Sequence, residues 1–516
     1  MSKKFESLSR IKRKEYHQLV MSAEEAVTKI PSGVNIGMSG FTGSGYPKEV
    51  PLALAKRIRE EHAKGKPFKV GVWTGASTAP ELDGALAEAD GIEMRLPYQS
   101  DPTCRKKINS GQMQYMDIHL SHVAQHAWFG FYGKLNIAVI EVVGVREDGS
   151  LIPSCAVGNN KTWIDQADFV ILEVNYALSE KLDGMHDIYY GTALPPHRMP
   201  VPITGVADRI GQSYYDCPAE KVIAIVETHA MDRDNVFSEP DEASKKIAEH
   251  ILTFLENEVD KGVLPANLLP IQSGVGNIAN AVMAGLNDGN FDDLTSYTEV
   301  IQDGMLNMVK SGKLVKVSAT SLSLSRKGFD DLFENIDFYR ERIILRTQEI
   351  SNHPEIVRRL GIIAINGMVE ADIYGNINST HVMGSDIING IGGSGDFARN
   401  GFMCFFVRPS IAKGGDISGI VPMVSHVDHT EHDSQIIVTE QGLADLRGLS
   451  PRQRAERIIE NCVHPDYRDG LRSYFERACE ENSGHTPHLL DEALSWHHRF
   501  KQTGTMKLSA DKAKSK

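Results

Sequence analysis

One acidic side chain, Glu299, stands among apolar neighbours in S-Y-T-E-V-I-Q-D-G (Ser296–Gly304). The pattern predicts a short strand from Tyr297 to Ile301 that ends at the Asp303–Gly304 turn. Burying a carboxylate in such a strand is costly unless the group is paired or used chemically. The competing interpretation is a solvent-facing glutamate on an edge strand.

Two glycine-rich segments accompany this glutamate. The first, S-G-V-G-N-I-A-N-A-V (Ser273–Val282), predicts a tight turn that leads into a helix capped by Asn277. The second, N-G-I-G-G-S-G-D-F (Asn389–Phe397), contains the G-x-G-x-x-G pattern of dinucleotide-binding folds. No apolar strand precedes it, and the next strand-like run begins at Phe402, which leaves no room for a crossover helix. We therefore expect a loop whose backbone N–H groups bind an oxyanion.

His426, His429 and His432 are spaced by three residues in the acidic segment H-V-D-H-T-E-H-D (His426–Asp433). A helix would bring such a triplet onto one face, as a metal requires, but this segment has the composition of a polar turn. We expect a solvated or hydrogen-bonded loop and no metal site.

Alternating strand and helix signals surround these segments, and this order predicts an α/β fold with parallel sheets. Strands are expected at 34–38, 68–73, 136–143, 169–174 and 222–226, and the later ones are dense in Val and Ile, as in strands covered on both faces. Helices are expected at 22–30, 50–62, 239–261, 451–463, 467–480 and 489–500, so the carboxyl-terminal segment is mostly helical.

The second half of the chain resembles the first. Gly149 and Gly158 are nine residues apart, as are Gly375 and Gly384, and the first glycine of each pair lies in a similar turn. The next strand begins later in the second copy, which therefore carries about eight extra residues at the glycine loop. We interpret this as an internal duplication and expect two α/β domains, residues 1–228 and residues 229–516, with Glu299 in the second.

The composition is that of an ordinary globular protein: 516 residues, 41% hydrophobic and 24% charged. The net charge of -13 argues against nucleic acid as the main partner. Six cysteines without a C-x-x-C pair indicate a reducing compartment and no structural zinc. No apolar run approaches the roughly 18 residues of a membrane span. We expect a cytoplasmic protein without a membrane partner; a basic transit peptide is the alternative, against which Glu6 and Glu15 count.

Several long motifs together resemble the acetyl-CoA hydrolase/transferase family, and most closely its bacterial succinyl-CoA:acetate CoA-transferase branch. The motifs are G-F-T-G-S-G-Y-P-K-E-V-P (Gly40–Pro51), the two glycine segments, Y-T-E-V-I-Q-D-G-M (Tyr297–Met305) and V-T-E-Q-G-L-A-D-L-R-G (Val438–Gly448). The likeness covers residues 31 to 506. It implies two related open-sheet α/β domains of the class I CoA-transferase type, and a homodimer.

The resemblance also assigns roles to individual residues. It implies that Glu299 is the nucleophile and that the backbone N–H groups of Val275 and Gly393 are the oxyanion donors. It places Asn352, Glu440 and Arg233 near the active site. The implied contacts with coenzyme A fall on Gly274, Val275, Gly276, Asn277, Ile278, Asn389, Gly393 and Lys413.

The implied reaction needs neither a metal nor a redox cofactor, because a glutamate is ionised at neutral pH, with a reference pKa of about 4.3, and attacks without a base. It proceeds through an acyl-glutamyl anhydride and a glutamyl-CoA thioester. Carboxylates attack thioesters poorly, so positioning has to contribute about 7–11 kcal/mol and each oxyanion donor about 3–4 kcal/mol. The substrates would be acyl-CoA and carboxylates, with succinyl-CoA and acetate the expected pair.

Three other functions remain open from the sequence. An acyl-CoA hydrolase would use the same residues and differ only in admitting water. A nicotinamide-dependent oxidoreductase would use Gly390–Gly395, and a non-catalytic metal-binding protein would use the three histidines.

Overall fold

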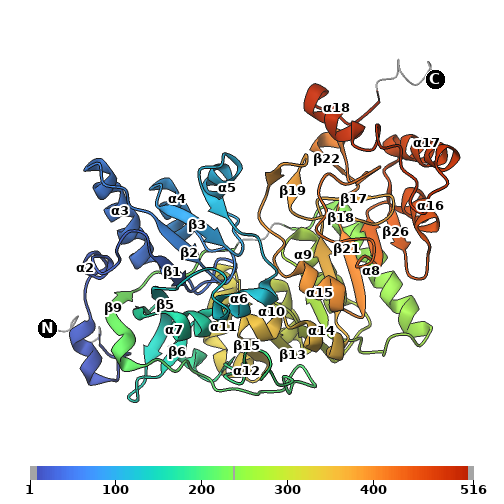
Figure 1. Ribbon diagram of the computed structural model, residues 1–516. Coiled ribbons are helices and arrows are strands. Elements are labelled where there is room, and N and C mark those ends of the chain that lie inside the picture. Colours follow the sequence, from blue (N-terminus) through green and yellow to red (C-terminus); the bar gives the residue numbers. More distant parts are fainter. Residues whose placement is uncertain (1–7, 236–238, 509–516) are drawn as a thin grey trace. The chain divides into compact units, whose positions relative to one another are not determined.

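The computed structural model describes residues 8–235 and 239–508, and the chain forms two compact units (Figure 1). Unit 1 consists of residues 1–236 and 295–360, and unit 2 of residues 237–294 and 361–516. This division differs from the expected one at residue 228, because the segment that carries Glu299 returns to unit 1.

The main sheet of unit 1 is parallel, with strand order β4-β3-β2-β1-β5-β7-β9, and β6 pairs with β5 in the antiparallel sense. Its strands are β1 (Asn35–Met38), β2 (Val70–Trp73), β3 (Ile92–Leu96), β4 (Gln114–Tyr115), β5 (Ile137–Val145), β6 (Leu151–Pro153), β7 (Phe169–Asn175) and β9 (Val222–Thr228). Every residue of β5 is buried, which explains why its sequence is a continuous Val- and Ile-rich run and not an alternating one.

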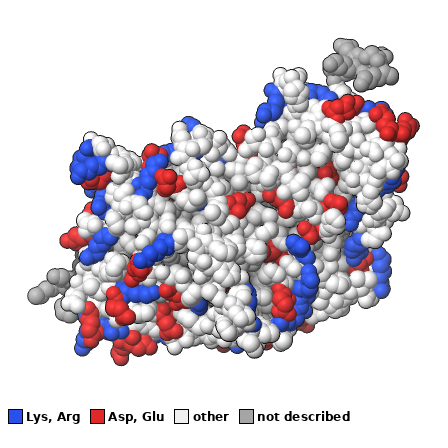
Figure 2. Space-filling model, in the orientation of Figure 1, with Lys and Arg blue, Asp and Glu red and all other residues white. Residues whose placement is uncertain are grey.

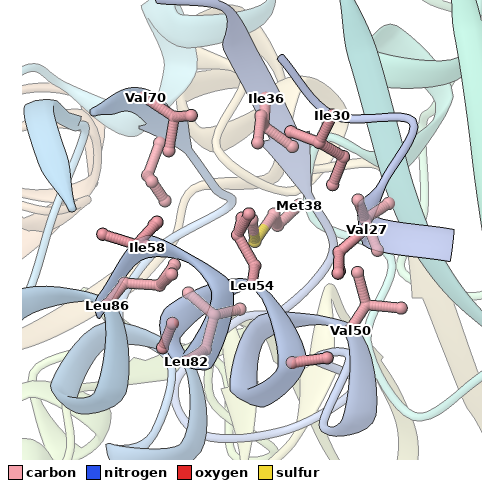
Figure 3. Packing of buried hydrophobic residues seen from close by; sticks show 14 of the residues in the cluster. Val27, Ile30, Ile36, Met38, Val50, Leu54, Ile58, Val70, Leu82 and Leu86 are labelled. Atoms are coloured by element: carbon pink, nitrogen blue, oxygen red, sulfur yellow. The ribbon is translucent and has the colours of Figure 1, made fainter. Parts of the chain in front are cut away.

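Helix α3 (Glu49–Ala63) covers one face of this sheet. Its buried positions Val50, Leu54 and Ile58 share one core cluster with strand residues of β1 and β2, which include Met38 and Val70 (Figure 3). The spacing of four places these three side chains on one face of the helix. The other helices of unit 1 are α2 (Ala23–Val27), α4 (Ala85–Glu88), α5 (Pro102–Asn109), α6 (Val123–Trp128), α7 (Asn160–Gln166), α10 (Asp303–Ser311), α11 (Arg326–Glu334), α12 (Ile336–Arg340), α13 (Gln348–Ser351) and α14 (Pro354–Leu360).

The returning segment of unit 1 adds strands that pair with β8 of the first segment, in the order β11-β13-β15-β8, and a separate parallel pair, β12 and β14. They are β8 (His186–Asp187), β11 (Leu294–Tyr297), β12 (Val300–Ile301), β13 (Leu314–Ala319), β14 (Ser321–Leu322) and β15 (Ile343–Arg346). Glu299 lies between β11 and β12.

Unit 2 also contains a parallel sheet, in the order β25-β21-β16-β10, with β26 antiparallel at its edge. Its strands are β10 (Ile271–Ser273), β16 (Ile363–Gly367), β17 (Glu370–Asp372), β18 (Ile377–Asn378), β19 (His381–Val382), β20 (Asp386–Ile387), β21 (Met403–Val407), β22 (Ile411–Ala412), β23 (Ile417–Ser418), β24 (Ile420–Val421), β25 (Ile436–Thr439) and β26 (Gly442–Asp445). Its helices are α8 (Glu242–Asp260), α9 (Asn277–Asp288), α15 (Ser394–Asn400), α16 (Pro451–Cys462), α17 (Pro465–Glu481) and α18 (Ser495–Thr503).

The two units share a sequence of elements, as the duplication predicts. In unit 1 a parallel strand, an antiparallel hairpin, a short helix and a second parallel strand follow one another as β5, β6, α7 and β7. In unit 2 the corresponding order is β16, β17 with β18, α15 and β21, and the additional pair β19 and β20 is inserted before α15. The hairpin turns contain Gly149 at φ 92° and Gly375 at φ 94°, a conformation that glycine adopts without strain. The predicted fold class is confirmed.

Two predicted helix boundaries are wrong. Asn277 does not cap α9, because the residue before the helix is Gly276 and Asn277 is the first helical residue. Helix α18 begins at Ser495, six residues after the predicted start at Leu489, because residues 490–494 form turns.

Lys/Arg and Asp/Glu side chains are interspersed over the face shown in Figure 2, without one continuous basic field. Within the described ranges, no helix is long and apolar enough to cross a membrane.

Candidate active site

Glu299 lies at a bend between β11 and β12, so the predicted continuous strand from Tyr297 to Ile301 is wrong. Its backbone carbonyl accepts hydrogen bonds from the N–H groups of Thr320 (2.9 Å) and Ser321 (3.1 Å). The chain therefore leaves the partners of β11 and pairs with β14. The bend follows the carboxyl end of β11, the end of a strand at which α/β folds bind ligands.

Glu299 is a partly exposed residue, and Nδ2 of Asn352 donates a hydrogen bond to its Oε1 at 2.5 Å. Burial raises the pKa of Glu299 to about 7, and the hydrogen bond from Asn352 acts in the opposite direction. A group with this pKa is about half ionised at neutral pH. Glu299 is therefore a carboxylate that titrates near pH 7, whereas an ordinary glutamate is fully ionised there.

Asn352 directly follows α13 and is fully buried. It lies 53 residues beyond Glu299 in the chain, and the two segments are held together by the hydrogen bond from the Tyr297 hydroxyl to the carbonyl of Ile350 at 2.5 Å. Of the three residues that the resemblance places near the active site, Asn352 is the one that contacts Glu299.

Arg233 is an exposed side chain of unit 1, and its Cδ lies 3.6 Å from the position that a Cβ on Gly43 would occupy. Gly43 belongs to the glycine turn 39–47 that follows β1. Ser321, next to the strand pairing of Glu299, donates from Oγ to the carbonyl of Phe41 in the same turn at 2.9 Å. The turn thus connects Arg233 to the strand beside Glu299, a role that its glycine content alone did not reveal.

A buried charge cluster fixes this turn. The ammonium of Lys48 donates to Asp232 at 2.6 Å and to Glu141, and Ser44 Oγ donates to Asp232 at 3.0 Å. Burial raises the pKa of Glu141 above its ordinary value, although the neighbouring Lys48 acts in the opposite direction. Asp232 precedes Arg233, so the cluster holds the backbone of Arg233. The sequence offered no signal for it, because its members are far apart in the chain.

In unit 2, the predicted turn at Ser273–Asn277 follows β10 and leads into α9. The N–H of Gly274 bonds to the carbonyl of Ile365 at 3.0 Å, and Gly276 has φ 125°, which a residue with a Cβ rarely adopts. The Val275 side chain is 54% exposed. Asn277 and Ile278 are partly exposed at the start of the helix. The backbone here faces outward at a helix N-terminus, where anions bind favourably.

The second glycine segment ends at α15, whose N-cap residue is Gly393. The prediction that no helix fits before the next strand is wrong, because α15 occupies residues 394–400. The strand before the loop is nevertheless the two-residue β20, which pairs antiparallel with β19, so the strand–turn–helix of a nucleotide-binding fold is not formed. Asn389 lies in the loop and is partly exposed.

Both helix N-termini lie at the same edge of the sheet in unit 2. Helix α9 begins just after β10, and α15 precedes β21, which is parallel to the neighbouring strand β16. A helix that connects parallel strands runs back across the sheet, so its N-terminus lies at the carboxyl ends of the strands. Val275 and Gly393 are thus placed at the carboxyl ends of the strands, the edge at which α/β folds bind ligands.

Glu440 and Lys413 also lie in unit 2. Glu440 follows β25 and accepts hydrogen bonds from the N–H (2.7 Å) and hydroxyl of Ser410. Although burial raises the pKa of Glu440, the hydrogen bonds from Ser410 and Gln441 bring it below its ordinary value. Lys413 is exposed, and its Nζ lies 5.1 Å from the centre of the Phe500 ring.

The three histidines diverge. His426 stacks on His381 and lies 3.4 Å from Asp428, and His429 is buried with Nε2 3.2 Å from Ser394 Oγ, whereas His432 is exposed. Within residues 8–235 and 239–508, no three His, Cys, Asp or Glu side chains are grouped so that they could hold a metal.

Two regions of the chain match domains of one known protein family. Residues 3–227 match the acetyl-CoA hydrolase/transferase N-terminal domain, and residues 328–475 match the C-terminal domain of the same family.

Individual proteins are similar over nearly the whole chain. A succinyl-CoA:acetate CoA-transferase from Clostridium kluyveri is 53% identical over 96% of this chain and 92% of its own. An acetyl-CoA hydrolase from Candida glabrata is 45% identical over 97% of each chain. The crystal structure of a 4-hydroxybutyrate CoA-transferase from Porphyromonas gingivalis, 21% identical, superposes with a TM-score of 0.61 over 90% of this chain and 98% of its own, which is a likeness of fold.

Proposed function

Because the chain belongs to the acetyl-CoA hydrolase/transferase family, we propose that it is a CoA-transferase that moves CoA from a short acyl-CoA to a free carboxylate. The expected reaction converts succinyl-CoA and acetate to acetyl-CoA and succinate, in keeping with the Clostridium kluyveri relative. The observation that carries the proposal is Glu299, a partly exposed residue just after β11 whose carboxyl accepts a hydrogen bond from Asn352.

In the proposed reaction a carboxylate oxygen of Glu299 attacks the thioester carbonyl carbon. The C–S bond breaks, its electron pair leaves with sulfur, and an acyl-glutamyl anhydride and CoA thiolate result. The thiolate then attacks the glutamyl carbonyl, and the anhydride C–O bond breaks to release the donor acid as its carboxylate. The acceptor carboxylate reverses these steps, so no proton is gained or lost overall.

Each attack places negative charge on a carbonyl oxygen, and we assign its stabilisation to the backbone N–H groups of Val275 and Gly393. Support comes from their places at the N-termini of α9 and α15, where such groups are already oriented. Asn352 keeps part of Glu299 ionised. Arg233 and Glu440 are proposed as supporting residues.

Coenzyme A is proposed to bind along Gly274–Ile278, Asn389 and Gly393, with Lys413 as the cation for its phosphates. The exposed ammonium of Lys413 and the outward backbone at Gly276 support this assignment. No metal or redox cofactor is needed by these steps. We further propose that the protein is cytoplasmic and forms a homodimer. Light scattering of the purified protein would test the homodimer by measuring its molar mass.

Acyl-CoA hydrolysis is the second candidate, because the Candida glabrata relative is an acetyl-CoA hydrolase. The same covalent intermediates would form, and water would take the place of the acceptor acid.

Mass spectrometry of the protein after addition of succinyl-CoA without acceptor tests the proposal. A CoA adduct that persists on the peptide containing Glu299, and disappears when acetate is added, is expected for a transferase. Rapid release of free CoA without acceptor indicates a hydrolase.

The variant Glu299→Gln should form no adduct and lose both activities, whereas Glu334→Gln, on the exposed end of α11, is the matched control and should behave like the wild type. Full activity of Glu299→Gln would refute the site.

A further inference from the structure

The amide of Asn352 has two ends with opposite hydrogen-bonding properties. In the observed orientation Nδ2 faces Glu299 Oε1 as a donor. Rotation of the amide by 180° would place Oδ1 against the carboxylate, where two acceptors repel each other. Asn352 can therefore support an ionised Glu299 in only one of its two orientations.

The neighbouring hydroxyl of Ser351 favours that orientation. Its Oγ donates to Asn352 Oδ1 at 2.8 Å and lies 3.3 Å from the carbonyl of Gln348. A hydroxyl has one proton, and the shorter contact is the one to Asn352. Both side chains are fully buried, so water does not replace this donor.

The backbone beneath these side chains is fixed at both ends of α13. Gln348 donates from its N–H to Gly158 (2.9 Å) and from Nε2 to Leu120 (3.0 Å). Tyr297 donates its hydroxyl to the carbonyl of Ile350 at 2.5 Å. Because Tyr297 is the last residue of β11 and lies two residues before Glu299, this bond connects α13 to the strand that leads into the bend at the nucleophile. With the backbone fixed in this way, the orientation of the Asn352 amide depends on the torsion of its side chain.

We propose that Ser351 is a positioning residue, which orients the amide of Asn352 so that Nδ2 meets Glu299. This inference rests on the proposed function, in which the ionised Glu299 is the nucleophile. Ser351 does not touch the nucleophile; it acts by satisfying Oδ1, which leaves the donor end of the amide for the carboxylate. Loss of the hydroxyl should weaken the Asn352–Glu299 hydrogen bond and reduce the ionised fraction of Glu299.

The test is the pH dependence of kcat/KM for succinyl-CoA, measured with acetate as acceptor, in Ser351→Ala. We expect a decrease of about two- to tenfold at pH 6.5, recovery at high pH, and an acid limb displaced to higher pH. Ser351→Thr keeps the hydroxyl and should restore the wild-type limb. Ser434→Ala is the matched control, because it removes an equally buried hydroxyl that bonds to the carbonyl of Gly375 in unit 2, and its acid limb should not move.

A double-mutant cycle with Asn352→Ala decides the case even if the added methyl of Ser351→Thr prevents folding. When Asn352 is already alanine, Ser351→Ala should cause no further displacement of the acid limb. Two results would overturn the role of Ser351 and leave the proposed function standing. The first is an equal displacement of the acid limb by Ser351→Ala with and without Asn352→Ala. The second is an acid limb that does not move in Ser351→Ala although the wild type is active. A wild type inactive with every acyl-CoA would overturn the proposed function itself.

Discussion

Replacement of Asn352 by alanine should change the pH range in which the enzyme works more than its maximal rate. Asn352 donates to the carboxylate of Glu299, whose pKa burial has already raised to about 7. Without this donor the charged form loses stabilisation while the protonated form is little affected. The pKa should rise further, so that less nucleophile is ionised at neutral pH.

The magnitude follows from the kind of hydrogen bond. A hydrogen bond to a charged group contributes about 1.5–3 kcal/mol, and each 1.36 kcal/mol corresponds to about one pKa unit. The pKa of Glu299 in Asn352→Ala is therefore expected at about 8–9. At pH 7 the ionised fraction would fall from about one half to about 1–10%, and kcat/KM by about 5- to 50-fold.

The assay is kcat/KM for acyl-CoA between pH 5.5 and 9.5, with the loss of thioester absorbance as the signal. The wild type should show an acid limb near pH 7, and the variant a limb one to two units higher with most of its activity regained at pH 9.5. Asn335→Ala, which removes an exposed amide of the same unit, is the control. A loss that is equal at every pH would show that Asn352 does not act through the ionisation of Glu299.

Three further outcomes are expected. Glu299→Gln should be more stable than the wild type at pH 8, by up to about 3 kcal/mol, and the difference should be smaller at pH 5. The reason is that the pKa of the Glu299 carboxyl is raised from 4.5 to about 7 in the folded protein, so the wild type loses stability as the pH rises through that window. Urea unfolding at both pH values measures the free energy of unfolding of each protein. His497→Ala should cost about 3–5 kcal/mol, because it leaves buried Glu370 without its 2.7 Å partner. Since the pKa of Glu370 is lowered to about 2, this deficit is present above pH 4.5 and should disappear toward pH 2; a deficit independent of pH would contradict the pairing. Lys413→Ala should raise KM for acyl-CoA about tenfold with little change in kcat, whereas Lys310→Ala, which removes a surface cation of unit 1, should change neither.

Local sequence pattern was sufficient where the burial of one regular element leaves a periodic signal in its own residues. The strand predicted at 169–174 is β7, and the long helix predicted at 239–261 is α8, because burial on both faces and a regular apolar stripe each leave a periodic signal. The run around Glu299 has the same apolar character, yet the chain bends there because Thr298 pairs with Ser318 and the next residues pair with β14. A change of strand partner is a property of the fold and leaves no local pattern.

The same distinction applies to the candidate site. The glycine turns at Gly276 and Gly392 are recognisable because their φ angles of 125° and 59° lie in a region that glycine adopts without strain. The contact between Glu299 and Asn352 joins residues 53 positions apart, and the hydroxyl of Ser351 is in no way distinctive in sequence. The resemblance to a family indicated Asn352, but neither composition nor spacing could show that its amide donates a hydrogen bond to the carboxylate of Glu299.

Each of the two compact units is built from two stretches of chain that are separated in the sequence. On the ribosome, residues 1–236 therefore emerge well before the stretch that completes their unit, and residues 237–294 remain incomplete until the last third of the polypeptide has been made. An amino-terminal fragment that ends at residue 228 would contain β9 but lack β11 and β15, and its unfinished apolar surface would be prone to aggregation. Neither half of the gene is expected to yield a stable protein by itself, so gene fission or exchange of single halves between relatives should be strongly disfavoured.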